Sequence, residues 1–150
     1  MKSRILRWRF HFNAMHNMTP EKEEGKHAHS FLVILCLDVK YMDLDKQNKC
    51  ERAIKEYLEQ FNGKYLNELD IFEGQIPTIE KIGETLYSET ERIISAYGMQ
   101  QIQLEVGDSP VALFSIGKKL LLGGMYREVP DEVYAGHKEL FEWRFVEEQK

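Results

Sequence analysis

Three histidines in the first part of the chain have the residue type and spacing that suit a metal ion. His27 and His29 are two residues apart in a predicted strand, so their side chains leave the same face. His16 ends the preceding predicted strand, and a hairpin would bring its imidazole beside the other two. Three neutral nitrogens suit Zn²⁺ and leave one coordination position open, as in catalytic zinc sites. On spacing alone, exposed or hydrogen-bonded histidines beside a loop remain the alternative.

The other histidines and the two cysteines show no such pattern. His11 faces the other side of its predicted strand, and His137 lies in the C-terminal part of the chain, so we interpret both as structural or surface residues. Cys36 falls in an apolar strand and Cys50 in a polar helix. We therefore expect reduced thiols, and neither is identified as a nucleophile by its spacing.

Hydrophobic periodicity predicts the elements that must hold these histidines. Strands are expected at residues 5–15, 27–39, 102–106 and 111–116, the last extending to 122, and helices at 46–61, 78–97 and 130–145. Thr78 is the expected N-cap of the second helix. The order predicts an α+β domain, in which an antiparallel four-stranded sheet carries two helices on one face and a C-terminal helical extension follows.

The bulk properties fit one globular domain. The chain has 150 residues and a net charge of −5, so nothing favours nucleic acid as a partner. No apolar run approaches the ~20 residues that span a bilayer, and no signal core follows the basic N-terminus, so we expect a cytoplasmic protein without membrane contact. A single four-stranded layer leaves two unpaired edges, which favours edge pairing between subunits.

Six short segments, in the right order, resemble those of the 6-pyruvoyltetrahydropterin synthase and 6-carboxytetrahydropterin synthase family. The segments are Phe12-Asn13-Ala14-Met15-His16, Lys26-His27-Ala28-His29-Ser30-Phe31, Tyr41-Met42-Asp43-Leu44, Tyr65-Leu66-Asn67, Pro77-Thr78-Ile79-Glu80 and Val106-Gly107-Asp108-Ser109-Pro110. The resemblance implies a T-fold over residues 1–126, with an extension at 127–150. It also implies zinc on the three histidines, and a homo-oligomer around a barrel with active sites at the subunit boundaries.

The resemblance further assigns positions to a pterin. Asp108 stands where the family has a Glu that anchors the guanidine-like edge of the pterin, and a carboxylate can accept two parallel hydrogen bonds from that edge. Asp is one methylene shorter than Glu. Thr78 and Glu80 align with further pterin-side groups, although helix capping explains both residues equally well.

The chain departs from the family at its proton-transfer residues. Glu23 replaces the catalytic Cys, Asn62 and Gly63 replace an Asp-His pair, and Ala28 replaces the glycine between the paired histidines. A subset of the family has Glu at the Cys position and cleaves 7,8-dihydroneopterin triphosphate to 6-hydroxymethyl-7,8-dihydropterin. Glu23 would then be a general base. A solvated Glu is equally expected, because this loop is acidic.

The leading hypothesis is a zinc-dependent lyase acting on 7,8-dihydroneopterin triphosphate or a related pterin. Its product would be a pyruvoyl, carboxy or hydroxymethyl pterin, in a pathway of the folate or queuosine type. The departures argue against the first two products. The alternatives are a non-catalytic homologue that binds zinc and a pterin or purine-like ligand, and a different zinc-assisted reaction on another heterocycle.

Overall fold

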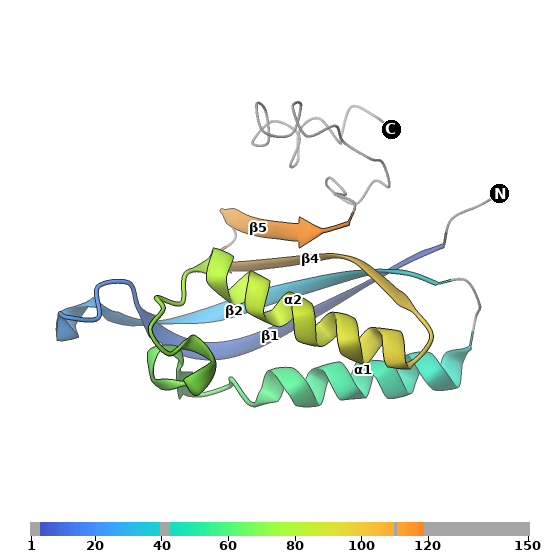
Figure 1. Ribbon diagram of the computed structural model, residues 1–150, viewed down its shortest axis with the longest axis horizontal. Helices are drawn as coiled ribbons and strands as arrows, with labels where there is room; N and C mark the ends of the chain where they lie inside the picture. Colours follow the sequence, from blue (N-terminus) through green and yellow to red (C-terminus); the bar gives the residue numbers. More distant parts are fainter. Residues whose placement is uncertain (1–3, 40–42, 110, 119–150) are drawn as a thin grey trace, which may run out of the picture.

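The computed structural model describes residues 4–39, 43–109 and 111–118. Its strands are β1 (Ile5–Asn17), β2 (Lys26–Asp38), β3 (Lys64–Tyr65), β4 (Gln100–Ser109) and β5 (Ala112–Gly117), and its α-helices are α1 (Leu44–Glu59) and α2 (Ile79–Ala96). Three short 3₁₀ turns connect them: η1 (Glu23–Gly25), η2 (Leu66–Glu68) and η3 (Asp70–Phe72). The elements form two layers, with both helices on one face of the sheet (Figure 1).

The sheet has the order β3-β1-β2-β4-β5. β1 and β2 form a long antiparallel hairpin, β2 pairs antiparallel with β4, and β4 pairs antiparallel with β5. Alternation along β1 and β2 places Phe12, Phe31 and Val33 on the helix-covered face, where they are almost fully buried. Apolar residues of both helices complete this core: Cys50, Ile54, Leu58, Ile82, Leu86, Ile93 and Ile94.

Both helices begin at side-chain caps. The Asp43 carboxylate accepts a hydrogen bond from the Lys46 N–H at the start of α1, 3.1 Å away. The Thr78 hydroxyl oxygen accepts one from the Lys81 N–H at the start of α2, also at 3.1 Å, which confirms the expected N-cap. Gly98, in the left-handed region at φ +80°, follows the end of α2.

The α+β prediction is confirmed, but the sheet contains five strands where the sequence predicts four. The additional strand, β3, has two residues and pairs parallel with Ala14 and Met15 of β1. It overlaps the start of the segment 65–75 that periodicity leaves irregular, because a two-residue strand is too short to show alternation.

Three sequence predictions fall outside the described residues. The C-terminal helix at 130–145, within the extension at 127–150, and the structural or surface role of His137 are two of them. The continuation of the last strand to 122 is the third, since β5 ends at Gly117 within the described part of the chain. The helices that the structure describes include none that is long and apolar enough to cross a membrane.

Candidate metal centre

The β1–β2 hairpin brings the three histidines together. His16 and His27 are directly opposite in the hairpin register, and His29 lies opposite Ala14 on the same face. The ring centres are 4.5 Å apart for His16 and His27, 5.2 Å for His16 and His29, and 4.7 Å for His27 and His29. Imidazoles bound to one tetrahedral zinc at about 2.0–2.1 Å have ring centres about 5 Å apart. The triangle therefore has the size that one metal ion requires.

Hydrogen bonds orient two of the three rings. Nδ1 of His16 lies 2.8 Å from the Pro77 carbonyl oxygen, and Nδ1 of His27 lies 2.8 Å from the Gly25 carbonyl oxygen. A carbonyl oxygen can only accept, so Nδ1 carries the proton and Nε2 of each neutral ring keeps its lone pair. Metal-binding histidines are commonly oriented in this way by a backbone carbonyl.

The Nε2 atom of His16 is buried and has no hydrogen-bond partner among the residues that the structure describes. Buried polar atoms without a partner are uncommon and call for an explanation such as an ion. The three histidines offer ligand nitrogens that all lie within 4.8 Å of one another. This donor set fits a divalent metal ion of the zinc type.

Burial also affects the charge of the site. Desolvation lowers the pKa of His16 below its ordinary value, and the nearby His27 and His29 lower it further, whereas the Pro77 carbonyl and Asp108 act in the opposite direction. A lowered pKa keeps the ring neutral over a wider pH range. The neutral imidazole is the form that binds a metal.

A pair of asparagines fixes the end of β1 next to His16. Asn67 accepts a hydrogen bond from the Asn17 N–H at 2.8 Å and donates one to the Asn17 carbonyl oxygen at 2.9 Å. The Asn17 side chain in turn donates to the Lys22 carbonyl oxygen at 2.9 Å. The sequence identified Tyr65-Leu66-Asn67 only as a segment that resembles the family. It did not predict the asparagine clasp, in which the Asn67 side chain bonds both backbone groups of Asn17.

Gly25 completes this loop because no larger residue fits. A Cβ atom at Gly25 would lie 2.4 Å from both the Asn17 Oδ1 and the Thr19 Oγ1 atoms. The close approach lets the Gly25 carbonyl reach Nδ1 of His27, so the clasp around Asn17 and the orientation of His27 are parts of one arrangement.

Asp108 lies beside the histidines. Its Oδ2 atom is 3.8 Å from Nε2 of His29, and both side chains are 28% exposed. The structure thus brings Asp108 to the histidine cluster. Its expected role as a pterin anchor stays a prediction.

The other expected site residues lie in the neighbouring turns. Glu23 begins η1, in the loop between β1 and β2, and is exposed. Thr78 caps α2 one residue after Pro77, whose carbonyl contacts His16. Glu80 is exposed in the first turn of α2. The capping interpretation of Thr78 is confirmed, and the pterin contacts of Thr78 and Glu80 and the catalytic role of Glu23 stay predictions.

Asn62 and Gly63, which stand at the positions of the family's Asp-His pair, connect the end of α1 to β1. The Asn62 side chain accepts a hydrogen bond from the Asn13 N–H at 2.8 Å, and the Gly63 N–H donates to the Asn13 carbonyl oxygen at 2.6 Å. Asn13 is on the opposite face of β1 from His16. These two residues therefore have a backbone-holding role in this chain.

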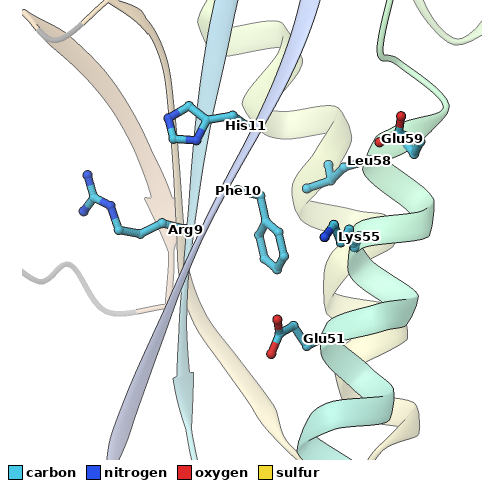
Figure 2. Close-up of a pocket in the computed structure, with 7 residues that line it drawn as sticks. All are labelled: Arg9, Phe10, His11, Glu51, Lys55, Leu58 and Glu59. Carbon is cyan, nitrogen blue, oxygen red and sulfur yellow. The ribbon is translucent and has the colours of Figure 1, made fainter.

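A cavity of about 230 Å³ lies between β1 and α1 and is lined by Arg9, Phe10, His11, Glu51, Lys55, Leu58 and Glu59. Figure 2 shows Phe10 pointing toward α1, whereas Arg9 and His11 point away from it. None of the three clustered histidines lines this cavity, so we do not assign the chemistry to it.

The cysteines are unsuited to nucleophilic chemistry. Cys36 and Cys50 are free and buried. Burial raises the pKa of each thiol to about 11, so each stays protonated near neutral pH. This agrees with the expectation that both are reduced.

Comparisons with known proteins agree with the fold described above. The family model of 6-pyruvoyl tetrahydropterin synthase matches residues 5–119. No curated protein matches the chain significantly. Among solved structures, 6-pyruvoyl tetrahydropterin synthase from Caenorhabditis elegans superposes with a TM-score of 0.64 at 15% identity, covering 78% of this chain and 96% of that one.

Two further structures share the fold. The enzyme of the same name from Plasmodium falciparum has a TM-score of 0.57 at 12% identity, with coverage of 77% of this chain and 98% of that one. An uncharacterized protein from Wolinella succinogenes has a TM-score of 0.55 at 13% identity, with coverage of 79% and 100%. The structures establish the fold and the family model establishes the relationship. The chain therefore belongs to the 6-pyruvoyl tetrahydropterin synthase family, whose members are lyases of pterin metabolism.

Proposed function

We propose that the protein is a zinc-dependent lyase that acts on 7,8-dihydroneopterin triphosphate or a closely related pterin. The observation that carries this proposal is the histidine triangle, in which Nε2 of His16 is buried without a partner while its Nδ1 is held by a backbone carbonyl. Membership of a family of pterin lyases supplies the substrate class.

The proposed ligands are His16, His27 and His29. His16 and His27 are each held in one tautomer by a carbonyl oxygen, so they present a preformed lone pair. These three residues would hold the zinc ion with one coordination position left for the substrate, and the ion would supply Lewis-acid polarisation of a substrate oxygen there. The hairpin register fixes the rings before a substrate binds.

Glu23 is the proposed general base, and the proposed product is 6-hydroxymethyl-7,8-dihydropterin. Glu23 would take the proton of the side-chain hydroxyl on the second carbon from the ring. The bond between the first and second side-chain carbons then breaks, and its electron pair passes to the C6=N5 bond of the pterin. The first carbon regains a proton, and the second leaves as an aldehyde that carries the triphosphate.

The pyruvoyl and carboxy products are less favoured for a structural reason. Asn62 and Gly63 occupy the positions of the Asp-His pair and are hydrogen-bonded to the backbone of Asn13. Neither residue has a side chain that exchanges a proton near neutral pH. A reaction that needs only one base fits this chain better than one that needs a further relay.

The pterin is proposed to lie against the start of α2. The Thr78 hydroxyl accepts a hydrogen bond from the Lys81 N–H, which leaves its own proton free to donate to a ligand. Glu80 is exposed in the same turn. Asp108 is the third residue that the family resemblance assigns to the pterin, and its Oδ2 atom lies 3.8 Å from Nε2 of His29.

A homo-oligomer with sites at its subunit boundaries is part of the proposal, as is a cytoplasmic location. Among the described residues, β5 is paired on one side only, and β1 is paired on its outer side only at Ala14 and Met15. Open edges of this kind favour pairing with another copy of the chain.

The alternative function is a non-catalytic homologue that binds zinc and a pterin or purine-like ligand. The structural roles of Asn62 and Gly63 favour it, because they replace a proton-transfer pair. The histidine triangle would serve either function, so conversion of the substrate is what distinguishes the lyase from the binding homologue.

The test is a product assay on the zinc-loaded protein. We expect 7,8-dihydroneopterin triphosphate to be converted to 6-hydroxymethyl-7,8-dihydropterin, resolved by chromatography. Replacing Glu23 with Ala should lower turnover by about 10²–10⁴-fold, the range typical for loss of a general base. Glu24→Ala is the matched control, because Glu24 is an exposed carboxylate in the same turn, and it should keep turnover.

Each outcome separates the hypotheses. Substrate binding without any pterin product in the intact protein would contradict the lyase and support the binding homologue. Equal turnover in the Glu23 and Glu24 variants would remove Glu23 from the mechanism and leave the metal-dependent reaction standing.

A further inference from the structure

A second apolar cluster lies on the sheet face opposite to the two helices. Cys36 and Ile102 form this cluster, and Ile5 packs against them. Cys36 follows the core residue Leu35, so alternation directs it to the other face of β2, and Ile5 shares that face because it lies opposite Asp38. Among the described residues, α1 and α2 both lie on the helix-covered face (Figure 1). We call the face that carries the second cluster the open face.

A bulge in the β2–β4 ladder brings Ile102 to the open face. Cys36 is paired with Gln103, and the next residue of β2 is paired with Gln101, so Ile102 is an additional residue between the two pairs. In a regular strand Ile102 would point toward the helices, as the core residue Leu104 does. The bulge changes its direction, so it contacts Cys36 instead.

The apolar side chains of the open face are almost fully buried. Ile34, Cys36 and Ile102 are 4%, 1% and 4% exposed. An antiparallel sheet whose second face is in water usually carries polar residues on that face, and removal of apolar surface from water is favourable. Among the described residues, no helix lies over the open face (Figure 1). The low exposure of these three side chains therefore calls for a layer other than α1 and α2.

The described chain ends beside this cluster. The Lys118 N–H, directly after β5, donates a hydrogen bond to the Ile102 carbonyl oxygen at 2.9 Å. The sequence then continues with Lys119 and the apolar run Leu120-Leu121-Leu122. An extended chain advances about 3.3 Å per residue, so these leucines are within reach of Ile102 without a linker.

The open face also carries a row of basic side chains. Arg7, Arg9 and His11 alternate along β1 on the face of the second cluster, and the latter two are exposed. The segment that follows the described chain has the opposite charge, because residues 128–150 include more acidic than basic side chains. Its apolar residues include Phe141 among others, so it offers both groups that the open face lacks.

We propose that residues 119–150 form the second layer of the molecule, packed over the open face against Cys36, Ile102 and Ile5. The occupant is the chain's own C-terminal segment, because the described chain ends beside the cluster and continues with an apolar run. Its acidic side chains lie near the basic row of β1. This inference is independent of the metal centre and of the proposed lyase reaction.

The test uses the two buried thiols as reporters. Cys36 belongs to the cluster on the open face, whereas Cys50 is buried in the core between the sheet and the helices. Labelling by a thiol reagent under native conditions, followed by mass spectrometry of the peptides, gives a rate for each thiol. In the full chain we expect both thiols to react slowly. Deletion of residues 119–150 should speed the labelling of Cys36 at least about tenfold and leave that of Cys50 unchanged, because only Cys36 loses its cover.

A point variant of the full chain provides a second measurement. Leu121→Asp places a charge in the apolar run and should also speed the labelling of Cys36, because an unpaired charge is costly to bury. Val111→Asp is the matched control: Val111 is 88% exposed between β4 and β5, so the same change there should alter neither rate. If the deletion unfolds the whole chain, both thiols react together, and the comparison of the two point variants decides the question.

Three results would overturn the inference. They are fast labelling of Cys36 in the full chain, slow labelling of Cys36 in a folded deletion variant, and equal rates in the Leu121 and Val111 variants. The identity of the occupant is tested by dilution of the full chain, for which we expect a labelling rate independent of protein concentration. A rate that rises on dilution, together with dissociation measured by light scattering, would assign the cover to a second copy of the chain instead.

Discussion

At the scale of single residues, the site depends on which ring nitrogen each histidine leaves free. The carbonyl oxygens of Pro77 and Gly25 fix Nδ1 of His16 and His27, so both rings keep Nε2 for a ligand. His16 is 1% exposed, whereas His27 is exposed. The site therefore combines a rigid buried donor with an accessible one, which suits entry of a metal from solvent.

Replacing His27 with Ala tests this arrangement. The variant should lose stoichiometric zinc while keeping its thermal unfolding transition in metal-free buffer, because His27 is exposed and contributes little to the core. Elemental analysis and calorimetry give the two readouts. His11→Ala is the matched control, since His11 is an exposed histidine on the other face of β1. Full zinc content in the His27 variant would refute the ligand assignment.

At the scale of elements, short connections place the hairpin against α2. Asn67 in η2 holds both backbone groups of Asn17, directly after His16, and Asn62 holds Asn13 farther along the same strand. Pro77, just before α2, accepts a hydrogen bond from His16. Segments without regular structure thus determine where the end of β1 lies.

The two asparagines provide a matched pair of variants. Asn67→Ala removes two hydrogen bonds to Asn17 and should destabilise the fold by about 1–3 kcal/mol, because partly buried groups lose their partners. It should also weaken zinc binding about tenfold, since His16 adjoins Asn17.

Asn62→Ala should lower stability in a similar way but leave zinc affinity unchanged, because its partner is the Asn13 N–H, three residues from His16, whereas Asn67 holds the residue directly after His16. Chemical denaturation and chelator competition measure the two effects separately. A loss of zinc affinity of equal size in both variants would mean that stability alone controls the site.

At the scale of the whole molecule, the two helices cover one face of the sheet, and its edges are open to pairing with another chain. Both helices lie on the histidine-bearing face, and β5 forms one edge of the layer (Figure 1). The Lys118 N–H donates to the Ile102 carbonyl oxygen of β4 at 2.9 Å. Because N–H groups alternate along a strand, the Ser115 N–H points away from β4.

We therefore expect the chain to form a homo-oligomer in which this edge takes part. Ser115→Pro should reduce the molar mass measured by light scattering, because proline removes the outward donor. Ser115→Ala is its control: it loses the hydrogen bond from the hydroxyl to Glu105 but keeps the backbone N–H, so it should assemble normally. A monomeric unchanged chain, or equal masses for both variants with retained folding, would contradict the prediction.

The sequence by itself determined the α+β class, the two helices, the Thr78 cap of the second one and the face shared by the histidines. These follow from local rules: residues two apart on a strand share a face, and Thr78 caps a helix wherever its neighbours start one. Its short motifs also indicated the family, because their order along the chain is preserved even where each one is brief.

Tertiary structure alone decided what surrounds the histidines. The hairpin register sets His16 opposite His27, Asn67 fixes the backbone of Asn17 beside them, and the end of β4 brings Asp108 to 3.8 Å from His29. These contacts join residues about 10–80 positions apart, and no local periodicity encodes their distances. The physical reason is that residues distant in sequence come into contact only when the strands have paired in one register and the connecting loops have packed against them.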